Sequence, residues 1–394
     1  MAPTELPSGV FLIPAQDRVV FGRPADVAVV GEADRHQARR IFVVSTRSLA
    51  RLTEGPLQRI VQALGPRHAG SFAEIRAHSP REDVIAAAAA ARAARADLLI
   101  AIGGGSVIDA TKAIQLCLWL GLDSPEAMEP YRGGVAAELA RPIEPPADAI
   151  RMVAVSTTLS ASEFTATAGI TDSRTHAKQG FTHRLLVPRQ VILDPAVTLD
   201  TPEWLLYATG IRAVDHAVES YCSPLANPAT DALALQGLRL LYRALPQIKA
   251  NPRDLRPRLD AQFGMWQSIA AAAAGAGSGA SHGIGYVLGA TFGVPHGHTS
   301  CVMLPAVLTW NAAVNGERQH ALSEIMGAPH RPASALIAEL IAALDQPGSL
   351  RAVGLGRDDL DVVAEHALSY PQVRMNPRPI TTAAQVKDIL ELAW

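Results

Sequence analysis

Three histidines and one arginine in the second half of the sequence are the side chains best placed to do chemistry. His216 lies in the segment GIRAVDHAVESY, which begins at residue 210, and His282 and His296 follow in SHGIGY and VPHGH. Neutral imidazoles drawn from separate elements are common ligands of zinc and iron. They also deliver protons and bind dicarboxylates. A lone histidine is usually a core or surface residue, but three beside glycine and proline predict one shared site.

Arg212 introduces a permanent positive charge into this group. It stands four residues before His216, so the two share one face of a predicted helix. A guanidinium binds a carboxylate or a developing enolate through two parallel hydrogen bonds, and it cannot coordinate a metal. Asp215 is turned about 100° away from His216 on that helix, which makes it a poor substitute ligand. The alternative is that Arg212 forms an ion pair with Asp215 or Glu219 that only fills space.

Two polar turns in the first half are suited to binding a nucleotide. Residues 102–109 run from a predicted strand through Gly103, Gly104 and Gly105 into a helix. Glycines let the backbone approach a phosphate, and the helix N-terminus attracts an anion. Residues 156–163 carry closely spaced hydroxyls that suit a ribose or a pyrophosphate. The alternatives are a plain tight turn in the first case and a helix cap, Ser160 to Glu163, in the second.

The elements that position these residues divide the chain in two. Up to about residue 195, short apolar runs alternate with helical segments, which predicts a parallel sheet covered on both faces. The expected strands are 40–45, 70–72, 97–102, 152–155 and 190–193, and the expected helices are 48–64, 83–96 and 106–120. After residue 195 we expect helices only, at 202–223, 229–245, 259–274, 282–288 and 333–344. The proline cluster at 142–146 predicts a surface loop.

Composition excludes several classes of protein. The chain has 394 residues, of which 48% are hydrophobic and 18% charged, and its net charge of −2 gives no footprint for nucleic acid or an anionic membrane. Cys117, Cys222 and Cys301 form no paired motif and are expected to be buried thiols. No signal peptide and no membrane-spanning run is expected, which predicts a cytoplasmic protein.

With these residues in place, the whole chain resembles the iron-containing (group III) alcohol dehydrogenases, and within them the maleylacetate reductases. The motifs that carry the resemblance are RVVFG at 18–22, GGGS at 103–106 with Asp109 and Lys112, STT at 156–158, Asp194-Pro195, GIRAVDHAVESY, LGATF at 288–292, and NPRP at 376–379 with Trp394. The resemblance implies a dehydroquinate synthase-like fold. Its α/β dinucleotide-binding domain would span residues 1–195 and its all-helical domain residues 196–394, in a homodimer.

The same resemblance assigns the cofactor-binding residues. Gly103, Gly104, Gly105, Ser106 and Asp109 belong to the pyrophosphate turn, Thr157 and Thr158 would line the cofactor, and Lys178 would reach the nicotinamide ribose. Where NAD-preferring relatives carry an aspartate after the second strand, this chain has Thr46, so either NADH or NADPH is expected.

Two positions depart from the metal-dependent members of the family. Arg212 replaces their aspartate ligand, and Tyr286 replaces a histidine that commonly follows the second metal histidine by four residues. Maleylacetate reductases typically also lack that aspartate and work without a metal. The chain is therefore expected to reduce maleylacetate to 3-oxoadipate with NAD(P)H, in the catabolism of aromatic compounds, without a metal. The catalytic residues would be Arg212, His216, His282, Tyr286 and His296, with Arg378 completing the pocket.

Three alternatives from other classes stay open. A zinc- or iron-dependent dehydrogenase of a small alcohol or aldehyde would hold its ion with His216, His282 and His296. A lyase resembling dehydroquinate synthase would use NAD transiently and show no net turnover of the cofactor. A binding protein would retain the nucleotide fold without catalysis.

Overall fold

The computed structural model describes residues 9–175 and 177–394, which form two compact units. One unit is Pro14–Pro202, and the other combines residues 9–13 with Glu203–Trp394. The sequence suggests a boundary after residue 195, whereas the structure keeps the next few residues with the first unit. Asp194 explains this, because its carboxylate accepts hydrogen bonds from the backbone N–H groups of Ala196 (2.9 Å) and Ala25 (2.8 Å).

The first unit is built on a six-stranded parallel sheet with the strand order β1-β8-β5-β4-β2-β3. The strands are β1 (Arg18–Phe21), β2 (Ile41–Val44), β3 (His68–Phe72), β4 (Leu98–Gly103), β5 (Met152–Ser156) and β8 (Gln190–Leu193). Five of the six lie where the apolar runs predict them, and β1 is an edge strand outside those runs. Their β-branched residues pack on a sheet buried on both faces.

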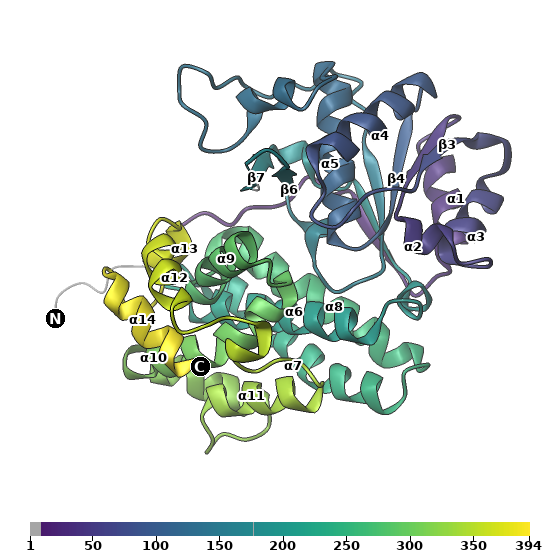
Figure 1. Cartoon of the computed structure of the whole chain (residues 1–394). Coiled ribbons are helices and arrows are strands. Elements are labelled where there is room, and N and C mark those ends of the chain that lie inside the picture. Colours follow the sequence, from purple (N-terminus) through teal and green to yellow (C-terminus); the bar gives the residue numbers. More distant parts are fainter. Residues whose placement is uncertain (1–8, 176) are drawn as a thin grey trace. The chain divides into compact units, whose positions relative to one another are not determined.

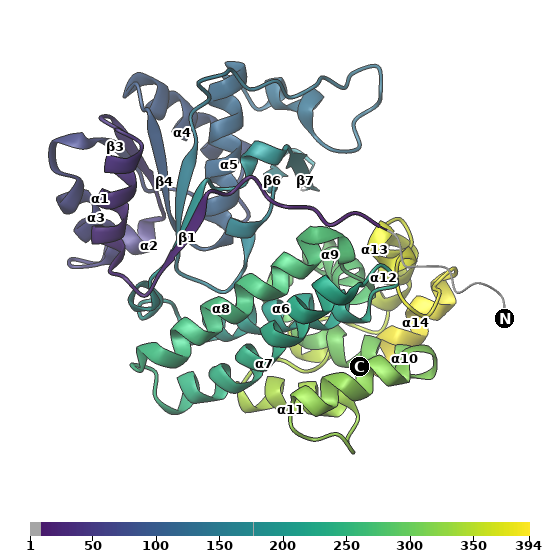
Figure 2. The same cartoon turned by 180° about the vertical axis from the view of Figure 1, so that it is seen from behind.

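Helices cover the two faces of this sheet, as Figures 1 and 2 show. Phe42 and Val44 pack in a core with α4 (Arg81–Ala93) and α5 (Gly105–Leu120). Ile41 and Val43 point the opposite way, into a core with α1 (Ala25–Arg35) and α3 (Pro56–Leu64). The period-2 alternation of side chains along a strand produces these two cores. The prediction of a doubly covered parallel sheet is confirmed.

Two features of this unit differ from the sequence prediction. The helix expected at 48–64 is split into α2 (Arg47–Ala50) and α3, because Gly55 caps α3 in an extended conformation and Pro56 occupies its first turn. An antiparallel hairpin, β6 (Thr167–Asp172) and β7 (Ala177–Thr182), was not predicted. The expected loop at 142–146 has no regular structure. The short 3₁₀ helices are η1 (Gly65–Arg67), η2 (Glu126–Tyr131), η3 (Ser162–Phe164), η4 (Arg184–Leu186) and η5 (Pro195–Thr198).

The second unit is helical throughout the residues that the structure describes, as predicted. Its helices are α6 (Glu203–Cys222), α7 (Pro228–Ala250), α8 (Leu255–Ala271), α9 (Ala280–Phe292), α10 (His296–Ile325), α11 (Ala333–Ala343), α12 (Asp359–Ala367), α13 (Pro371–Arg374) and α14 (Ala383–Leu392), with a π turn η6 (Ala272–Ala276) and a 3₁₀ turn η7 (Arg351–Val353). Every residue of α6 from Leu206 to Cys222 is buried. A helix buried all round lies in the core, and α6 packs against α7, α8, α9 and α10.

Two further properties follow from the described residues. Cys117, Cys222 and Cys301 are buried and unpaired, as expected. Within the described ranges, every helix is too short or too polar to cross a lipid bilayer.

Candidate functional site

Glycines bring the start of α10 close to α6 and α9. A Cβ added at Gly297 would lie 2.5 Å from the backbone carbonyl carbon of Ala208 in α6. A Cβ added at Gly285 in α9 would lie 2.8 Å from Oγ1 of Thr299 in α10. Both distances are too short for any larger residue, so these glycines set how closely the three helices approach. The side chains that face this junction are consequently held within contact distance.

The predicted catalytic residues gather at this junction of α6, α9 and the start of α10. The ring centroids of His216 and His282 are 4.8 Å apart, and those of Tyr286 and His296 are 5.8 Å apart in a stacked arrangement. His282 and Tyr286 meet edge to face at 6.4 Å. The guanidinium carbon of Arg212 lies 5.8 Å from the centre of the Tyr286 ring. The structure therefore brings the five residues together.

Arg212 is almost completely enclosed, with 6% of its surface exposed. Its Nη1 donates a hydrogen bond to Oγ of Ser300 at 3.0 Å. Its Nη1 is also 4.0 Å from Oδ2 of Asp215, at the limit of an ion pair. A guanidinium carries five N–H donors in a fixed plane. Arg212 thus has donor capacity beyond these contacts within a buried, polar environment.

Asp215 is fully buried and belongs to the site, although its helical position made it a poor ligand in the sequence analysis. Its Oδ2 accepts hydrogen bonds from Oγ of Ser300 at 2.6 Å and from Oγ of Ser281 at 2.8 Å. The same oxygen is 3.4 Å from Nδ1 of His282. Asp215 therefore points toward α9 and α10, and it links both helices to α6.

Glu219 caps the start of α9 from a neighbouring helix. Its carboxylate accepts hydrogen bonds from the backbone N–H groups of Gly279 (2.7 Å), Ser281 (2.7 Å) and His282 (3.4 Å). The residue at the N-cap of α9, Gly279, has no side chain to do this. The first N–H groups of a helix need an acceptor, and a carboxylate also complements the helix dipole. Glu219 therefore fixes where α9 begins.

Glu219 also orients the imidazole of His282. Its Oε2 lies 2.7 Å from Nδ1 of His282, a hydrogen bond in which the ring nitrogen donates, because the oxygens of Glu219 already act as acceptors for the backbone N–H groups of Gly279 and Ser281. This places the ring proton on Nδ1 and the lone pair on Nε2. Nε2 of His282, Nδ1 of His216 and Oδ1 of Asp215 are buried without a hydrogen-bond partner in the described part of the chain. Unsatisfied buried polar atoms are concentrated where a protein binds something else.

Burial shifts the titration of these groups toward their neutral forms. It lowers the pKa of His282 to about 3, with the charge of Arg212 adding to the effect. It lowers the pKa of His216 well below the ordinary value, helped by His282 and Arg212. It raises the pKa of Asp215 to about 6 and that of Glu219 to about 7. His216 and His282 are therefore neutral, and Arg212 is the fixed positive charge.

The cluster of Asp215, Glu219 and His282 does not itself form a tetrahedral metal site. Ligands of one tetrahedral ion at about 2.1 Å stand roughly 3.4 Å apart, whereas Nδ1 of His282 and Oε2 of Glu219 are joined by a 2.7 Å hydrogen bond. In the described ranges, the ligand atoms that gather within 4.8 Å belong to Asp215, Glu219 and His282 rather than to the three histidines. The nearby Arg212 opposes a second cation. No chemical step through a metal is derived from this site.

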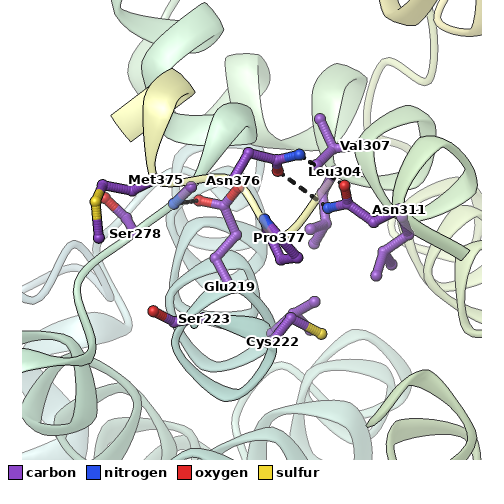
Figure 3. Close-up of a pocket in the computed structure, with 13 residues that line it drawn as sticks. Glu219, Cys222, Ser223, Ser278, Leu304, Val307, Asn311, Met375, Asn376 and Pro377 are labelled. Atoms are coloured by element: carbon purple, nitrogen blue, oxygen red, sulfur yellow. Dashed lines mark hydrogen bonds between the residues drawn. The ribbon is translucent and has the colours of Figure 1, made fainter. Parts of the chain in front are cut away.

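A pocket lies on the other side of Glu219, between α6, α10 and the segment after α13 (Figure 3). Asn311 and Asn376 face each other across it and exchange hydrogen bonds of 2.7 and 3.0 Å. Arg378, expected to complete the catalytic pocket, instead packs on Trp310 with its guanidinium carbon 3.6 Å from the ring centre. The C-terminal motif therefore fastens this segment to α10.

The predicted glycine turn joins β4 to α5 in the α/β unit. Gly103 ends β4 with a φ of 157°, and a Cβ there would be 2.6 Å from Cγ2 of Val107. A Cβ on Gly104 would be 2.9 Å from Cγ2 of Thr158, and one on Gly105 would be 3.0 Å from Oγ of Ser160. Small residues are therefore required at all three positions for the chain to turn into α5. The N-terminus of this 16-residue helix is left accessible to an anion.

The second predicted cluster folds against this turn. The backbone N–H of Thr157 donates to the carbonyl of Gly103 at 3.1 Å, and Oγ1 of Thr158 donates to Oγ of Ser160. Ser106 accepts a hydrogen bond from the backbone of His78 at 3.1 Å. The two motifs therefore form one surface at the carboxyl ends of β4 and β5, where open α/β sheets bind ligands.

Thr46, Asp109 and Lys178 lie around this surface. Thr46 follows β2 and caps α2 through its hydroxyl, beside the end of β4. Asp109 accepts a hydrogen bond from the backbone N–H of Gly169 at 3.1 Å. The stem of Lys178 crosses Gly169, where an added Cβ would be 2.4 Å from its Cε. Asp109 and Lys178 are thus neighbours on one side of the glycine turn.

Lys112 has a structural task in this region. It is fully buried, and its Nζ donates to the carbonyl oxygens of Ser162 (2.7 Å) and Thr167 (2.8 Å) as well as to Asp109 (3.2 Å). These bonds tie α5 to the hairpin that carries Lys178.

Sequence reasoning missed two contacts that hold the site: Glu219 orients His282, and Ser300 accepts a hydrogen bond from Arg212. It also missed Ser281, whose hydroxyl donates to Asp215 beside them. One signal was available in α6. Arg212, Asp215 and Glu219 are charged residues in a helix whose other residues are mostly apolar, and charges buried in a core need partners.

Comparison with known proteins is consistent with this architecture. The family model described as iron-containing alcohol dehydrogenase matches residues 16–195, and that of the Fe-containing alcohol dehydrogenase family, C-terminal, matches residues 206–394. The chain is 33% identical over 370 residues to a maleylacetate reductase of Sphingobium indicum, covering 93% of both chains. It is 32% identical to a maleylacetate reductase of Burkholderia cepacia, covering 96% of this chain and 95% of the other. The crystal structure of maleylacetate reductase from a Rhizobium strain superimposes with a TM-score of 0.81, at 28% identity and 99% coverage of both.

Proposed function

The chain belongs to the iron-containing alcohol dehydrogenase family, in its maleylacetate reductase-like branch, and is an NAD(P)-dependent oxidoreductase; from this premise we propose that it reduces maleylacetate to 3-oxoadipate without a metal ion. The observation that carries the proposal is Arg212. It supplies a buried positive charge among neutral histidines, with hydrogen-bond donors left over for a ligand.

The reaction needs a group that stabilises negative charge on oxygen. A hydride from the nicotinamide adds to the alkene carbon that is β to the ketone. The π electrons then move onto the ketone oxygen, which gives an enolate. The enolate then takes one proton at its α-carbon, so that NAD(P)H and H⁺ are consumed and NAD(P)⁺ is released. A fixed cation that binds a carboxylate or the enolate performs the task of a Lewis acid in this step.

The proton comes from a group other than His282 in its neutral form. Since Nδ1 of His282 donates to Glu219, its Nε2 is an acceptor. Tyr286 has a phenol O–H, and the guanidinium carbon of Arg212 lies 5.8 Å from the centre of its ring, so Tyr286 is the proton donor that we assign. His216 and His296 flank the same space and bind the second carboxylate of the substrate.

The cofactor is NADH or NADPH bound at the surface that the two polar turns form. The α5 N-terminus and the glycine turn would take the pyrophosphate, and Thr157, Thr158 and Lys178 would contact the rest of the cofactor. Thr46, without a carboxylate, leaves room for a 2′-phosphate. As in the resemblance, we expect the active protein to be a homodimer.

The proposal is tested by following NADH and NADPH oxidation with maleylacetate and identifying the product. Wild-type protein should form 3-oxoadipate with one cofactor oxidised per product. Oxidation of small alcohols with no maleylacetate turnover would favour a conventional alcohol dehydrogenase. Product formed from another substrate without net cofactor turnover would favour a lyase. Cofactor binding with no turnover at all would leave a binding protein.

A further inference from the structure

Arg212 would bind a carboxylate well only if its guanidinium is held in one orientation. A long, flexible side chain loses rotamer freedom when it is fixed in one orientation. The stacking distance to Tyr286 is 5.8 Å, which restrains the guanidinium weakly. The firm contact is the 3.0 Å hydrogen bond from Nη1 to the hydroxyl of Ser300.

We propose that Asp215 positions Arg212 through the hydroxyl of Ser300 and thereby determines the preference for a substrate that carries a carboxylate. This inference rests on the proposed function, in which Arg212 is the carboxylate-binding residue. Asp215 and Ser300 act through Arg212 and are positioning residues.

The hydroxyl of Ser300 has a single proton, and the positions of its neighbours determine which of them accepts this proton in a hydrogen bond. Oγ of Ser300 lies 2.6 Å from Oδ2 of Asp215, and a carboxylate only accepts, so Ser300 donates there. Its lone pairs then face Arg212 and accept the Nη1–H. A neutral hydroxyl polarised by a carboxylate is a stronger acceptor than an isolated one. Arg212 therefore donates to Ser300, and Ser300 donates to Asp215, so the two hydrogen bonds run in one direction.

Charge balance gives the second argument. Asp215 is fully buried and Arg212 nearly so, and the two side chains are one helical turn apart on α6. A buried charge is tolerated where an opposite charge compensates it. The direct distance of 4.0 Å is longer than a hydrogen bond, so the pair interacts mainly through Ser300. An ion pair that only filled space would not require the intervening hydroxyl.

The chain offers a matched control for the relay. Ser281 also donates its hydroxyl to Oδ2 of Asp215, at 2.8 Å, and within the described part of the chain this hydroxyl makes no hydrogen bond to Arg212. Ser281→Ala and Ser300→Ala remove the same chemical group from the same carboxylate oxygen. They differ in whether Arg212 loses its acceptor.

We would measure KM and kcat for maleylacetate and KM for the cofactor in both variants, with crystal structures of each. Ser300→Ala should raise KM for maleylacetate by about 10- to 100-fold, the range for a hydrogen bond to a charged group. Ser281→Ala should stay within about threefold, and KM for NADH should be unchanged in both. Ser300→Thr, which keeps the hydroxyl, should recover most of the loss.

Equal effects of the two alanine variants would overturn the inference. The crystal structures decide it independently of turnover, because the Arg212 guanidinium should move in Ser300→Ala and stay in Ser281→Ala. An unmoved guanidinium in Ser300→Ala would refute the relay. A wild-type protein that does not reduce maleylacetate would instead refute the proposed function, and the structural comparison would still judge the relay.

Discussion

The cap that Glu219 provides for α9 gives a sharp test of how the site is held. In Glu219→Gln the side chain keeps its shape but has one acceptor oxygen and one N–H₂ donor. The best orientation places the oxygen where Oε2 lies, which keeps the bonds from Gly279 and His282. The N–H₂ group then faces the backbone N–H of Ser281, whose 2.7 Å bond to Oε1 is lost.

The cost can be worked from these contacts. One buried backbone donor left unsatisfied costs about 1–3 kcal/mol, and the loss of negative charge weakens the remaining bonds by roughly 1 kcal/mol more. A total of about 3 kcal/mol lowers the Tm of a unit of this size by about 6–12 °C. Asp254→Asn is the matched control, because Asp254 caps α8 in an exposed position where asparagine caps equally well.

Thermal unfolding followed by calorimetry and by far-ultraviolet circular dichroism measures both variants. We expect the large decrease for Glu219→Gln and a change under about 2 °C for Asp254→Asn. If the two variants melt within 2 °C of each other, the carboxylate of Glu219 does not carry the start of α9, and the assignment of His282 as an Nδ1–H tautomer loses its support.

Three further predictions use the same site. Gly297→Ala should destabilise the helical unit by about 1–3 kcal/mol or more, because the added Cβ would clash with the backbone of Ala208. Gly316→Ala is the control in the same helix, where the space around the glycine is open, and it should stabilise the unit by about 0.5–1 kcal/mol. The free energies of unfolding of both variants are compared by urea denaturation. Because the folded pKa of His282 (about 3) and of His216 lies below the unfolded value of 6.5, their contribution to stability is present above pH 6.5 and is lost as the pH falls toward 3. The raised pKa values of Asp215 (about 6) and Glu219 (about 7) give a contribution of opposite sign, which is gained as the pH falls through them. The stability of the wild type relative to His282→Asn should therefore decrease as the pH falls from 6.5 to 4, and a difference that stays constant over this range would contradict the assignment. Arg212→Lys should lower kcat/KM for maleylacetate by about 10- to 100-fold and Arg212→Ala by about 100- to 1,000-fold, with unchanged KM for NADH; equal activity of Lys and Arg would exclude bidentate binding.

Much of the fold could be predicted because its signals are local. The β-branched runs that became β2, β4, β5 and β8 are each bounded by turn residues, and the glycine turn follows its strand directly. The break between α2 and α3 has a local signal too, because Gly55 and Pro56 are typical of the start of a helix. The 30-residue helix α10 was missed because its pattern has almost no apolar face, since it is packed on several sides. The hairpin β6–β7 was missed because its strands alternate polar and small residues weakly.

Most residues of the site could be predicted from the sequence, but their hydrogen-bond partners could not. The three histidines and Arg212 could be grouped from their types and spacing, and Tyr286 from the family resemblance. The partners of Asp215 come from positions 66 and 85 residues further along the chain, and no sequence period relates them. Helical geometry correctly separated Asp215 from His216, but it could not show that the face on which Asp215 lies is covered by α9 and α10. Contacts of this kind are fixed by tertiary packing.

The measurement that tests the central claim most directly is maleylacetate reduction by protein stripped with EDTA and checked for residual metal by elemental analysis, before and after addition of Zn²⁺ or Fe²⁺. If Arg212 takes the place of a metal, the stripped protein should be fully active and added metal should change the rate by less than about twofold. Activity that is absent until the metal returns would contradict the account, because it would mean that the histidines hold an ion beside Arg212.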